Sequence, residues 1–216
     1  LDWYNPIIGH MQHHLRDPSR DHAHGRVYRV TYKGRPLTKP AAIHGRPIKE
    51  LLELLKSMDD RVRYRTRIEL SGRDSNQVAG ATKTWVAGLD PKDSEHEHHL
   101  LEGLWLLTQH NIADRDLLVR VLRSKDHRAR AAATRVLRVM RDRVSDALDL
   151  LTPQARDEHP RVRLEAVVAA SFFLDARAAA VALEAKRFPT DKFLDYALKE
   201  TMRALDTIWR AAIARG

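Results

Sequence analysis

Five histidines lie close together near the start of the chain, in the stretch GHMQHHLRDPSRDHAHGR. They are His10, His13, His14, His22 and His24. Imidazole nitrogens are common ligands of divalent metal ions, so this clustering suggests metal binding. A helical turn over residues 7–15 would place His10 on one face with His13 or His14, and an extended HAH would place His22 and His24 on one face. The two pairs could together hold one divalent ion.

Charged residues separate these histidines and allow two other interpretations. They are Arg16, Asp17, Arg20, Asp21 and Arg26. In a metal site, Asp17 or Asp21 would orient the imidazoles. In a solvated loop, Asp17 would instead cap a turn at Pro18 and pair with Arg20. In a ligand site, the three arginines would offer forked donors to a phosphate or carboxylate of a substrate or cofactor. The residues alone leave all three interpretations open.

The composition narrows the chemistry that the chain can perform. None of its 216 residues is a cysteine, which excludes disulfides, thiolate metal sites, cysteine nucleophiles and a CxxCH haem attachment within this sequence. We find no P-loop, dinucleotide-binding fingerprint, Ser/His/Asp triad order or Glu-based metalloprotease motif, and we assign no catalytic residue. No apolar run approaches the roughly 20 residues that span a bilayer. The net charge of +9 allows binding to nucleic acid, an acidic protein or an anionic surface.

The elements that must position these residues change in character along the chain. The segment GRVYRVTYKGRPL is rich in β-branched and aromatic residues and predicts a short strand over 27–32, ended by a turn at Lys33 and Gly34. Three prolines then follow within twelve residues, which predicts a connector over 36–46. From Pro47 onward, apolar residues recur at helical spacing, and charged residues at 31% against aromatics at 6% favour helices throughout. We therefore expect domains at 1–40 and 41–216.

Three stretches of the helical part align with one another: SMDDRVRYRTRIEL, SKDHRARAAATRVL and DEHPRVRLEAVVAA. The aligned motif residues are Asp59, Val62, Arg63, Asp126, Arg130, Val162 and Arg163. The last two aligned arginines are 33 residues apart and the first two 67 apart, so one unit is missing between them, and DSEHEHHLLEGLWLL fills that gap. A fifth unit begins at PTDKFLDYALKETMRAL. A period of about 33 residues with two helices predicts an all-α solenoid of about five helical hairpins, after a short extended N-terminal segment.

Several conspicuous side chains of this region are expected to be structural. We assign Trp85, Trp105 and Trp209 to core packing because they occur at apolar helical spacing. The stripe of Leu194, Leu198, Met202, Leu205 and Trp209 predicts one long final helix. His96 and His99 can share a helical face, but without a third ligand nearby in sequence we do not predict zinc there.

The aligned motif resembles that of HEAT repeats. In that family the second helix of a unit opens with Asp-x-x-Val-Arg, which DDRVR matches fully at Asp59, Val62 and Arg63. The resemblance implies that the aspartate caps the helix and that the arginine reaches the neighbouring unit. Ala129 replaces the valine in KDHRAR, and SEHEHHLLEGLW lacks the Val-Arg pair altogether.

A second resemblance covers roughly residues 2–37, DWYNPIIGHMQHHLRDPSRDHAHGRVYRVTYKGRPL. This stretch, followed by the repeats, is similar to a segment of the PVC-type membrane-bound dehydrogenases. That family joins a glucose/sorbosone-dehydrogenase-like β-propeller to HEAT repeats and a c-type cytochrome domain. The resemblance implies that residues 25–30 complete the last propeller blade. It also implies a periplasmic or cell-envelope location, with a quinone-type cofactor and c-type haem in domains outside this sequence.

Three functions follow as hypotheses. The first is a scaffold segment of such a redox enzyme, which holds the propeller against the cytochrome domain and is not catalytically complete alone. The second is a nucleic-acid-binding repeat protein, suggested by the charge and by the helix HRARAAATRVLRVMRDR. Its six arginines cannot all share one face, which argues against a phosphate-tracking groove. The third is a protein-interaction solenoid that binds a partner on its concave face.

Overall fold

The structure is a computed structural model that describes residue 18, residues 23–24 and residues 27–215. The chain divides into two compact units, Leu1–Ala41 and Ala42–Gly216. This division lies one residue beyond the boundary expected between residues 40 and 41.

In the first unit, the predicted strand over 27–32 is not confirmed. Val27 alone takes part in a β-bridge, and residues 28–32 form neither helix nor strand. Val27, Val30 and Tyr32 are 88%, 82% and 73% exposed, so they do not pack into a sheet, where alternate side chains of a half-buried strand would be covered. The predicted turn at Lys33 and Gly34 is present.

The second unit is built from helices, and its described residues contain no strand. The α-helices are α2 (Ile48–Leu54), α3 (Asp60–Ser71), α4 (Ser75–Ala87), α5 (His96–Gln109), α6 (Arg115–Leu122), α7 (His127–Met140), α8 (Ala147–Ala155), α9 (Pro160–Ala170), α10 (Arg177–Leu183), α11 (Lys192–Ala204) and α12 (Asp206–Ile213). Two short 3-10 helices, η1 (Arg141–Arg143) and η2 (Glu184–Arg187), follow α7 and α10.

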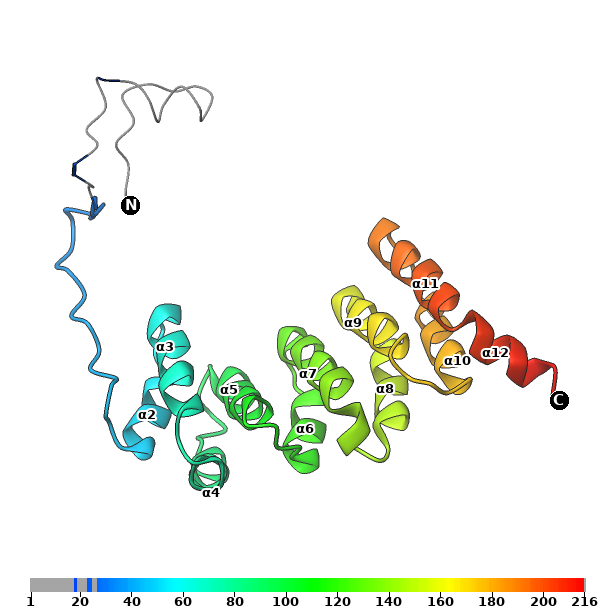
Figure 1. Ribbon diagram of the computed structural model, residues 1–216, viewed down its shortest axis with the longest axis horizontal. Helices are drawn as coiled ribbons and strands as arrows, with labels where there is room; N and C mark the ends of the chain where they lie inside the picture. Colours follow the sequence, from blue (N-terminus) through cyan, green and yellow to red (C-terminus); the bar gives the residue numbers. More distant parts are fainter. Residues whose placement is uncertain (1–17, 19–22, 25–26, 216) are drawn as a thin grey trace. The chain divides into compact units, whose positions relative to one another are not determined.

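These helices form two rows. Figure 1 shows the odd-numbered helices from α3 to α11 following one another in one row, with the even-numbered helices from α2 to α10 in the other. Each helix of one row packs against a sequence neighbour in the other row. Each odd-numbered helix from α3 to α9 also packs against the next helix of its own row, as α2 does against α4 and α8 against α10. The chain is therefore an all-helical, solenoid-like array, in which each helical pair completes its core against its neighbours.

Side-chain caps fix where many helices begin. Asp59, Asp74, Asp114, Asp126 and Asp191 each accept a backbone N–H from the first turn of the helix that follows. These bonds satisfy donors that have no partner inside the helix. The caps stand at the sequence positions that the aligned repeats predict for Asp59 and Asp126.

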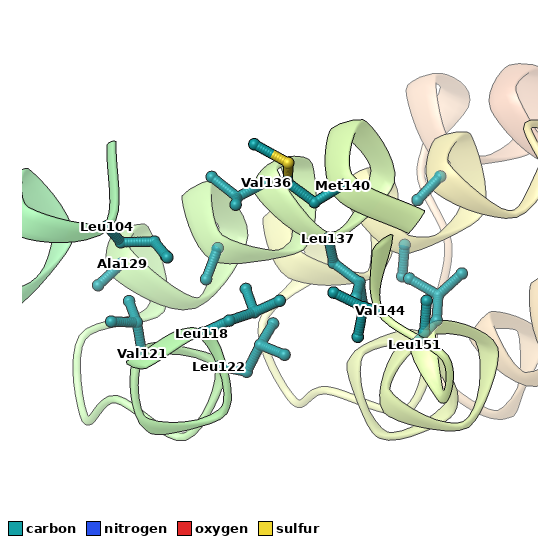
Figure 2. Packing of buried hydrophobic residues seen from close by; sticks show 14 of the residues in the cluster. Leu104, Leu118, Val121, Leu122, Ala129, Val136, Leu137, Met140, Val144 and Leu151 are labelled. Atoms are coloured by element: carbon teal, nitrogen blue, oxygen red, sulfur yellow. The ribbon is translucent and has the colours of Figure 1, made fainter. Parts of the chain in front are cut away.

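A continuous apolar core runs between the two rows. Figure 2 shows its central part, where leucines of α6 such as Leu118 and Leu122 lie close to Val136 and Leu137 of α7. The side chain of Leu137 is completely buried. Small residues such as Ala129 and Ala133 of α7 are also buried, which lets neighbouring helices approach closely.

The C-terminal end differs from the prediction of one long helix. The chain leaves helical geometry at Leu205, where φ is −92° and ψ is 2°, so α11 ends at Ala204 and α12 begins at Asp206. Leu205 is nearly fully buried at this break, and Met202 and Trp209 pack against the core on either side of it. Within the described ranges, no helix combines the length and the apolar character needed to cross a membrane.

Candidate functional site: a groove along one row of helices

Most residues of the predicted N-terminal site lie outside the described residues. This holds for His10, His13, His14, Arg16, Asp17, Arg20, Asp21, His22 and Arg26. His24 is described and is exposed. Among the residues that the structure does describe, no group of three or more His, Asp or Glu side chains is arranged to hold a metal ion.

The aligned arginines Arg63, Arg130 and Arg163, here called the stacking arginines, each tie down the loop before their own helix. Each stands four residues after a helix N-cap, and its Nη1 atom donates to a backbone carbonyl six residues earlier. The bonds are Arg63 to Ser57 (2.6 Å), Arg130 to Ser124 (2.9 Å) and Arg163 to Asp157 (2.9 Å). The same role therefore recurs at the same register in three units.

The residue two positions before each N-cap completes this motif and was not predicted from the sequence. Ser57 and Ser124 accept the backbone N–H of Asp59 and Asp126 through their Oγ atoms, at 3.2 Å and 3.1 Å. Asp157 accepts that of His159 at 2.8 Å. The signal was present in the alignment, because all three residues occupy one column of the aligned stretches.

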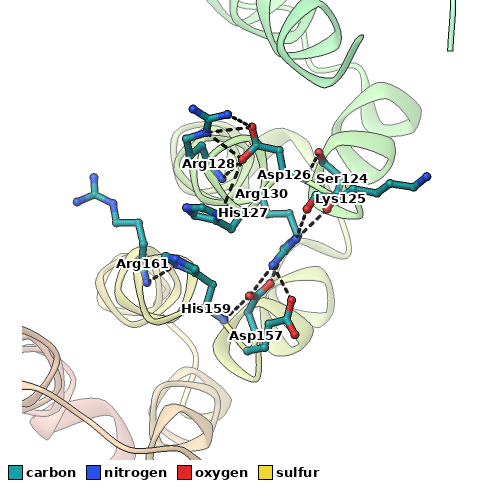
Figure 3. Close-up of polar contacts among 10 residues, drawn as sticks. Ser124, Lys125, Asp126, His127, Arg128, Arg130, Asp157, His159 and Arg161 are labelled. Atoms are coloured by element: carbon teal, nitrogen blue, oxygen red, sulfur yellow. Dashed lines mark hydrogen bonds and ion pairs between the residues drawn. The ribbon is translucent and has the colours of Figure 1, made fainter. Parts of the chain in front are cut away.

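All three stacking arginines also join their unit to the next one, Arg63 through an ion pair with Glu102 of α5 and the other two through hydrogen bonds. Figure 3 shows Arg130 of α7 reaching Asp157, which its Nε and Nη2 atoms contact at 2.6 Å and 2.9 Å. Both side chains are mostly buried, at 12% and 9% exposed. The hydrogen bonds that Arg130 donates to the Asp157 carboxylate raise the pKa of Arg130 further above its already high value. Arg163 of α9 reaches the carbonyl oxygen of Pro189, at 2.9 Å, and lies over the ring of Phe188.

The unit that lacks the Val-Arg pair carries a histidine at the stacking position. His99 stands four residues after the N-cap Glu95, and its Nδ1 atom lies 3.5 Å from Asp93, in the loop of its own unit. Burial lowers the pKa of His99, and the nearby Asp93 carboxylate only partly opposes this. This unit therefore keeps its loop contact without an arginine.

A buried carboxylate joins α3 to α5. Glu102 is fully buried and accepts two bonds from Arg67, at 2.6 Å and 2.8 Å, while Arg63 Nε and His98 Nε2 each lie 3.3 Å away. Burial alone would raise the pKa of Glu102, but bonding to His98 and Arg67 outweighs burial and lowers it. Glu102 is therefore an ionised structural group at neutral pH.

Two histidines meet face to face where α7 and α9 begin. The rings of His127 and His159 are stacked, and His159 Nδ1 caps α9 by accepting the N–H of Arg161 at 3.2 Å (Figure 3). An acceptor nitrogen carries no proton, so the cap requires a neutral imidazole. Burial and the neighbouring His127 lower the pKa of His159, which favours that neutral form.

The surface of the α5, α7, α9 and α11 row carries three adjoining hollows, together called the groove. The first lies between α5 and α7, the second also reaches α9, and the third lies among α7, α9 and α11. Trp105 and Arg128 line the first two, while Arg135 and Arg161 line the last two, so the hollows are continuous.

The groove combines exposed apolar side chains with arginines. Val139, Phe193 and Tyr196 line it and are 56%, 62% and 68% exposed, so apolar surface along the groove is open to solvent. The arginines of α7 and η1 take different positions. Arg128, Arg135 and Arg138 of α7 line the groove. Arg130 of α7 bonds to Asp157, and Arg143 of η1 donates to the carbonyl of Asn111.

Comparison with known proteins gives no family for this chain. No protein-family model matches it, and no curated protein matches it. Similar solved structures include crystal structures of two engineered proteins. One has a TM-score of 0.46 and 17% identity over 77% of this chain and 87% of its own. The other has a TM-score of 0.43 and 19% identity over 74% of this chain and 78% of its own.

Proposed function

We propose that this chain is an interaction scaffold of HEAT type, built of five helical-hairpin units, that binds a protein partner along the groove. The observation that carries this proposal is the groove itself, a continuous concave strip on one row of helices that leaves Val139, Phe193 and Tyr196 exposed. Exposed apolar surface of this kind marks interaction sites in proteins. The buried polar groups, in contrast, are used in joints between units, as Glu102 and Arg130 show.

A site-specific cross-linking experiment tests the scaffold function. A photoreactive amino acid replaces Val139, which is in the groove, or Leu183, a 44% exposed residue of α10 in the other row. We expect one defined protein partner to be captured in the native cell extract from position 139 and not from position 183. Equal capture from both positions, or none from position 139, would contradict a groove-based function.

We also propose, from the resemblance of residues 2–37, that the scaffold belongs to a multidomain redox dehydrogenase of the cell envelope. In that enzyme it would hold a propeller with a quinone-type cofactor against a haem-bearing cytochrome domain. The sequence of the flanking gene tests this: it should encode a propeller before residue 1 and a CxxCH motif after residue 216. A gene that lacks either domain would refute this assignment, but it would not affect the proposed interaction function of the groove.

A further inference from the structure

We propose that the groove between α7 and α11 takes an extended acidic peptide that carries a bulky apolar side chain. This inference rests on the proposed function and names the chemistry of the partner. The evidence is the imbalance of charge in this part of the groove, together with a mostly apolar hollow beside it.

The arginines of the groove outnumber the carboxylates that pair with them. Arg128 is held by Asp126 at 2.8 Å. Arg135 and Arg161 share the single carboxylate of Glu165, at 3.3 Å and 2.9 Å. Four arginines, with Arg138 as the fourth, thus have two carboxylates as ion-pair partners, while Glu200, which also lines this part of the groove, pairs with Arg203.

Arg138 is the arginine best placed to receive an acidic group. Among the described residues, no carboxylate lies within ion-pair distance of it, and its guanidinium lies over the ring of Phe172, at 5.0 Å from the centroid. Stacking on an aromatic ring holds the guanidinium plane but leaves its N–H donors without an anionic acceptor. A carboxylate of a bound peptide would supply that acceptor.

The neighbouring hollow would take the apolar side chain. Leu164 and Val168 of α9 form its floor with Ala197 of α11, and the exposed rings of Phe193 and Tyr196 line it. A bulky side chain placed there would cover apolar surface that is otherwise in contact with water. Arg135 and Arg138 of α7 and Arg161 of α9 line the same hollow, so acidic residues would flank the apolar anchor.

The dimensions of the groove set the length of the peptide. Packed helices lie about 8–10 Å apart, so the path from α7 across α9 to α11 covers about 20 Å. An extended chain rises about 3.3 Å per residue and crosses this path with about six residues. Carboxylates also line the groove, at Glu97, Glu165 and Glu200, so a phosphate backbone, which is charged at every unit, would meet them, whereas a peptide can place its few carboxylates opposite the arginines alone. These carboxylates favour a peptide over a nucleic acid.

Fluorescence anisotropy with the full chain tests this inference. The probes are labelled peptides of about ten residues, long enough for the path above. One has Asp and Glu around a central Leu, one has Asn and Gln at the acidic positions, and one has Lys there; an oligothymidine of equal length is the fourth probe. We expect the acidic peptide to bind about tenfold more tightly than its amide counterpart, because only carboxylates form charge-assisted bonds with arginine.

Two variants locate the binding site. Arg138→Glu should weaken binding of the acidic peptide about fivefold to tenfold, because it replaces an attraction with a repulsion. Arg123→Glu is the matched control: it makes the same charge change at the exposed C-cap of α6, in the other row, and should change affinity less than about twofold. Far-UV circular dichroism verifies that both variants keep their helical content.

Other outcomes would overturn the inference in distinguishable ways. If the amide and acidic peptides bind equally, and Phe193→Ala with Tyr196→Ala weakens both, the groove binds apolar peptides and the acidic class is wrong. If oligothymidine binds more tightly than any peptide and Arg138→Glu weakens it, the partner is a nucleic acid and the proposed function also fails. If no probe binds, the acidic class fails, while cross-linking from position 139 still decides the scaffold function.

Discussion

The imidazole rings of His127 and His159 are stacked, with centroids 3.6 Å apart and planes inclined by 14°. One ring begins α7 and the other caps α9, so the pair joins two neighbouring units. Charge on both rings would repel across this short distance. Protonation of His159 at Nδ1 would also remove the acceptor that caps α9.

Stability should therefore fall as the pH drops. The pKa of His159 lies below its ordinary value of 6.5, because of burial and then the neighbouring His127, with Arg130 and Arg163 acting in the same direction and Asp157 opposing. Below about pH 6.5, His159 binds a proton more readily in the unfolded chain than in the folded one. The contribution of neutral His159 to stability is therefore complete above that pH, and it is lost as the pH falls through the pKa that His159 has in the folded protein. Urea unfolding at about pH 7.5 and pH 5.5 measures this loss.

His159→Asn keeps a capping oxygen but cannot titrate, so it should reduce the loss of stability between these two pH values by about 1 kcal/mol. His44→Asn is the control, because the His44 side chain is 99% exposed and lies far from this joint in sequence. His99, whose pKa is also lowered, remains in both variants and keeps part of the pH dependence. An unchanged pH dependence in His159→Asn would contradict a role for the stacked pair.

Arg130→Ala should destabilise the fold strongly. It removes the guanidinium group that bonds to Asp157 and leaves a mostly buried carboxylate without its cation. Such a loss costs about 3–5 kcal/mol in comparable sites. Arg128→Ala, two residues earlier on the same helix, removes an 81% exposed guanidinium and should cost less than about 1 kcal/mol. Similar free energies of unfolding for the two variants would refute the structural importance of Arg130.

Glu102→Gln should also be destabilising, by about 3 kcal/mol, because Arg67 and Arg63 would lose their shared counter-charge in a buried place. Glu50→Gln serves as the comparison, since its pair with Arg46 is about half exposed and is worth only about 0.5 kcal/mol. Chemical denaturation of both variants measures the difference. A cost for Glu102→Gln as small as that for Glu50→Gln would show that the network contributes little.

Two helical glycines should respond to alanine in opposite directions. A Cβ atom at Gly103 of α5 would lie 2.6 Å from Val86 Cγ2, so Gly103→Ala should overpack the α4 and α5 contact and cost about 1–3 kcal/mol. A Cβ at Gly80 of α4 meets nothing within 4 Å, so Gly80→Ala should stabilise by about 0.5–1 kcal/mol through helix propensity. Thermal unfolding of both variants measures whether Gly103→Ala lowers the melting temperature and Gly80→Ala raises it.

Much of the helical array could be predicted from the sequence because its signals are local. Apolar spacing such as Leu51, Leu52 and Leu55 gives helices, and the recurring Asp and Arg positions give their starts. The all-helical, solenoid-like fold is confirmed. Other features depend on distant partners. The helix breaks at Leu205, but the apolar spacing of the sequence continues unchanged past this residue. The spacing therefore gives no sign of the break.

The groove could be predicted only as a concave face of the second helices. Its charge balance depends on which arginines find partners, and that depends on contacts across units. Arg135 and Arg161 share Glu165 from two different helices, whereas Arg130, in the same run of arginines, is held by Asp157. The metal, ligand and capping interpretations of the N-terminal histidines stay predictions, because nearly all of those residues lie outside the described ranges.

The histidine at the stacking position of α5 has a mechanical consequence. Arg130 and Arg163 fasten their units to the next one, but His99 contacts Asp93 within its own unit and forms no such tie to α7. The joint between this unit and the next then rests on apolar packing, on the contact between His96 of α5 and Arg120 of α6, at 3.1 Å, and on the partly exposed ion pair of Lys83 in α4 with Asp114 before α6. Under tension, this seam should part before the seams that Arg130 and Arg163 fasten, with α6 to α11 holding together as one block.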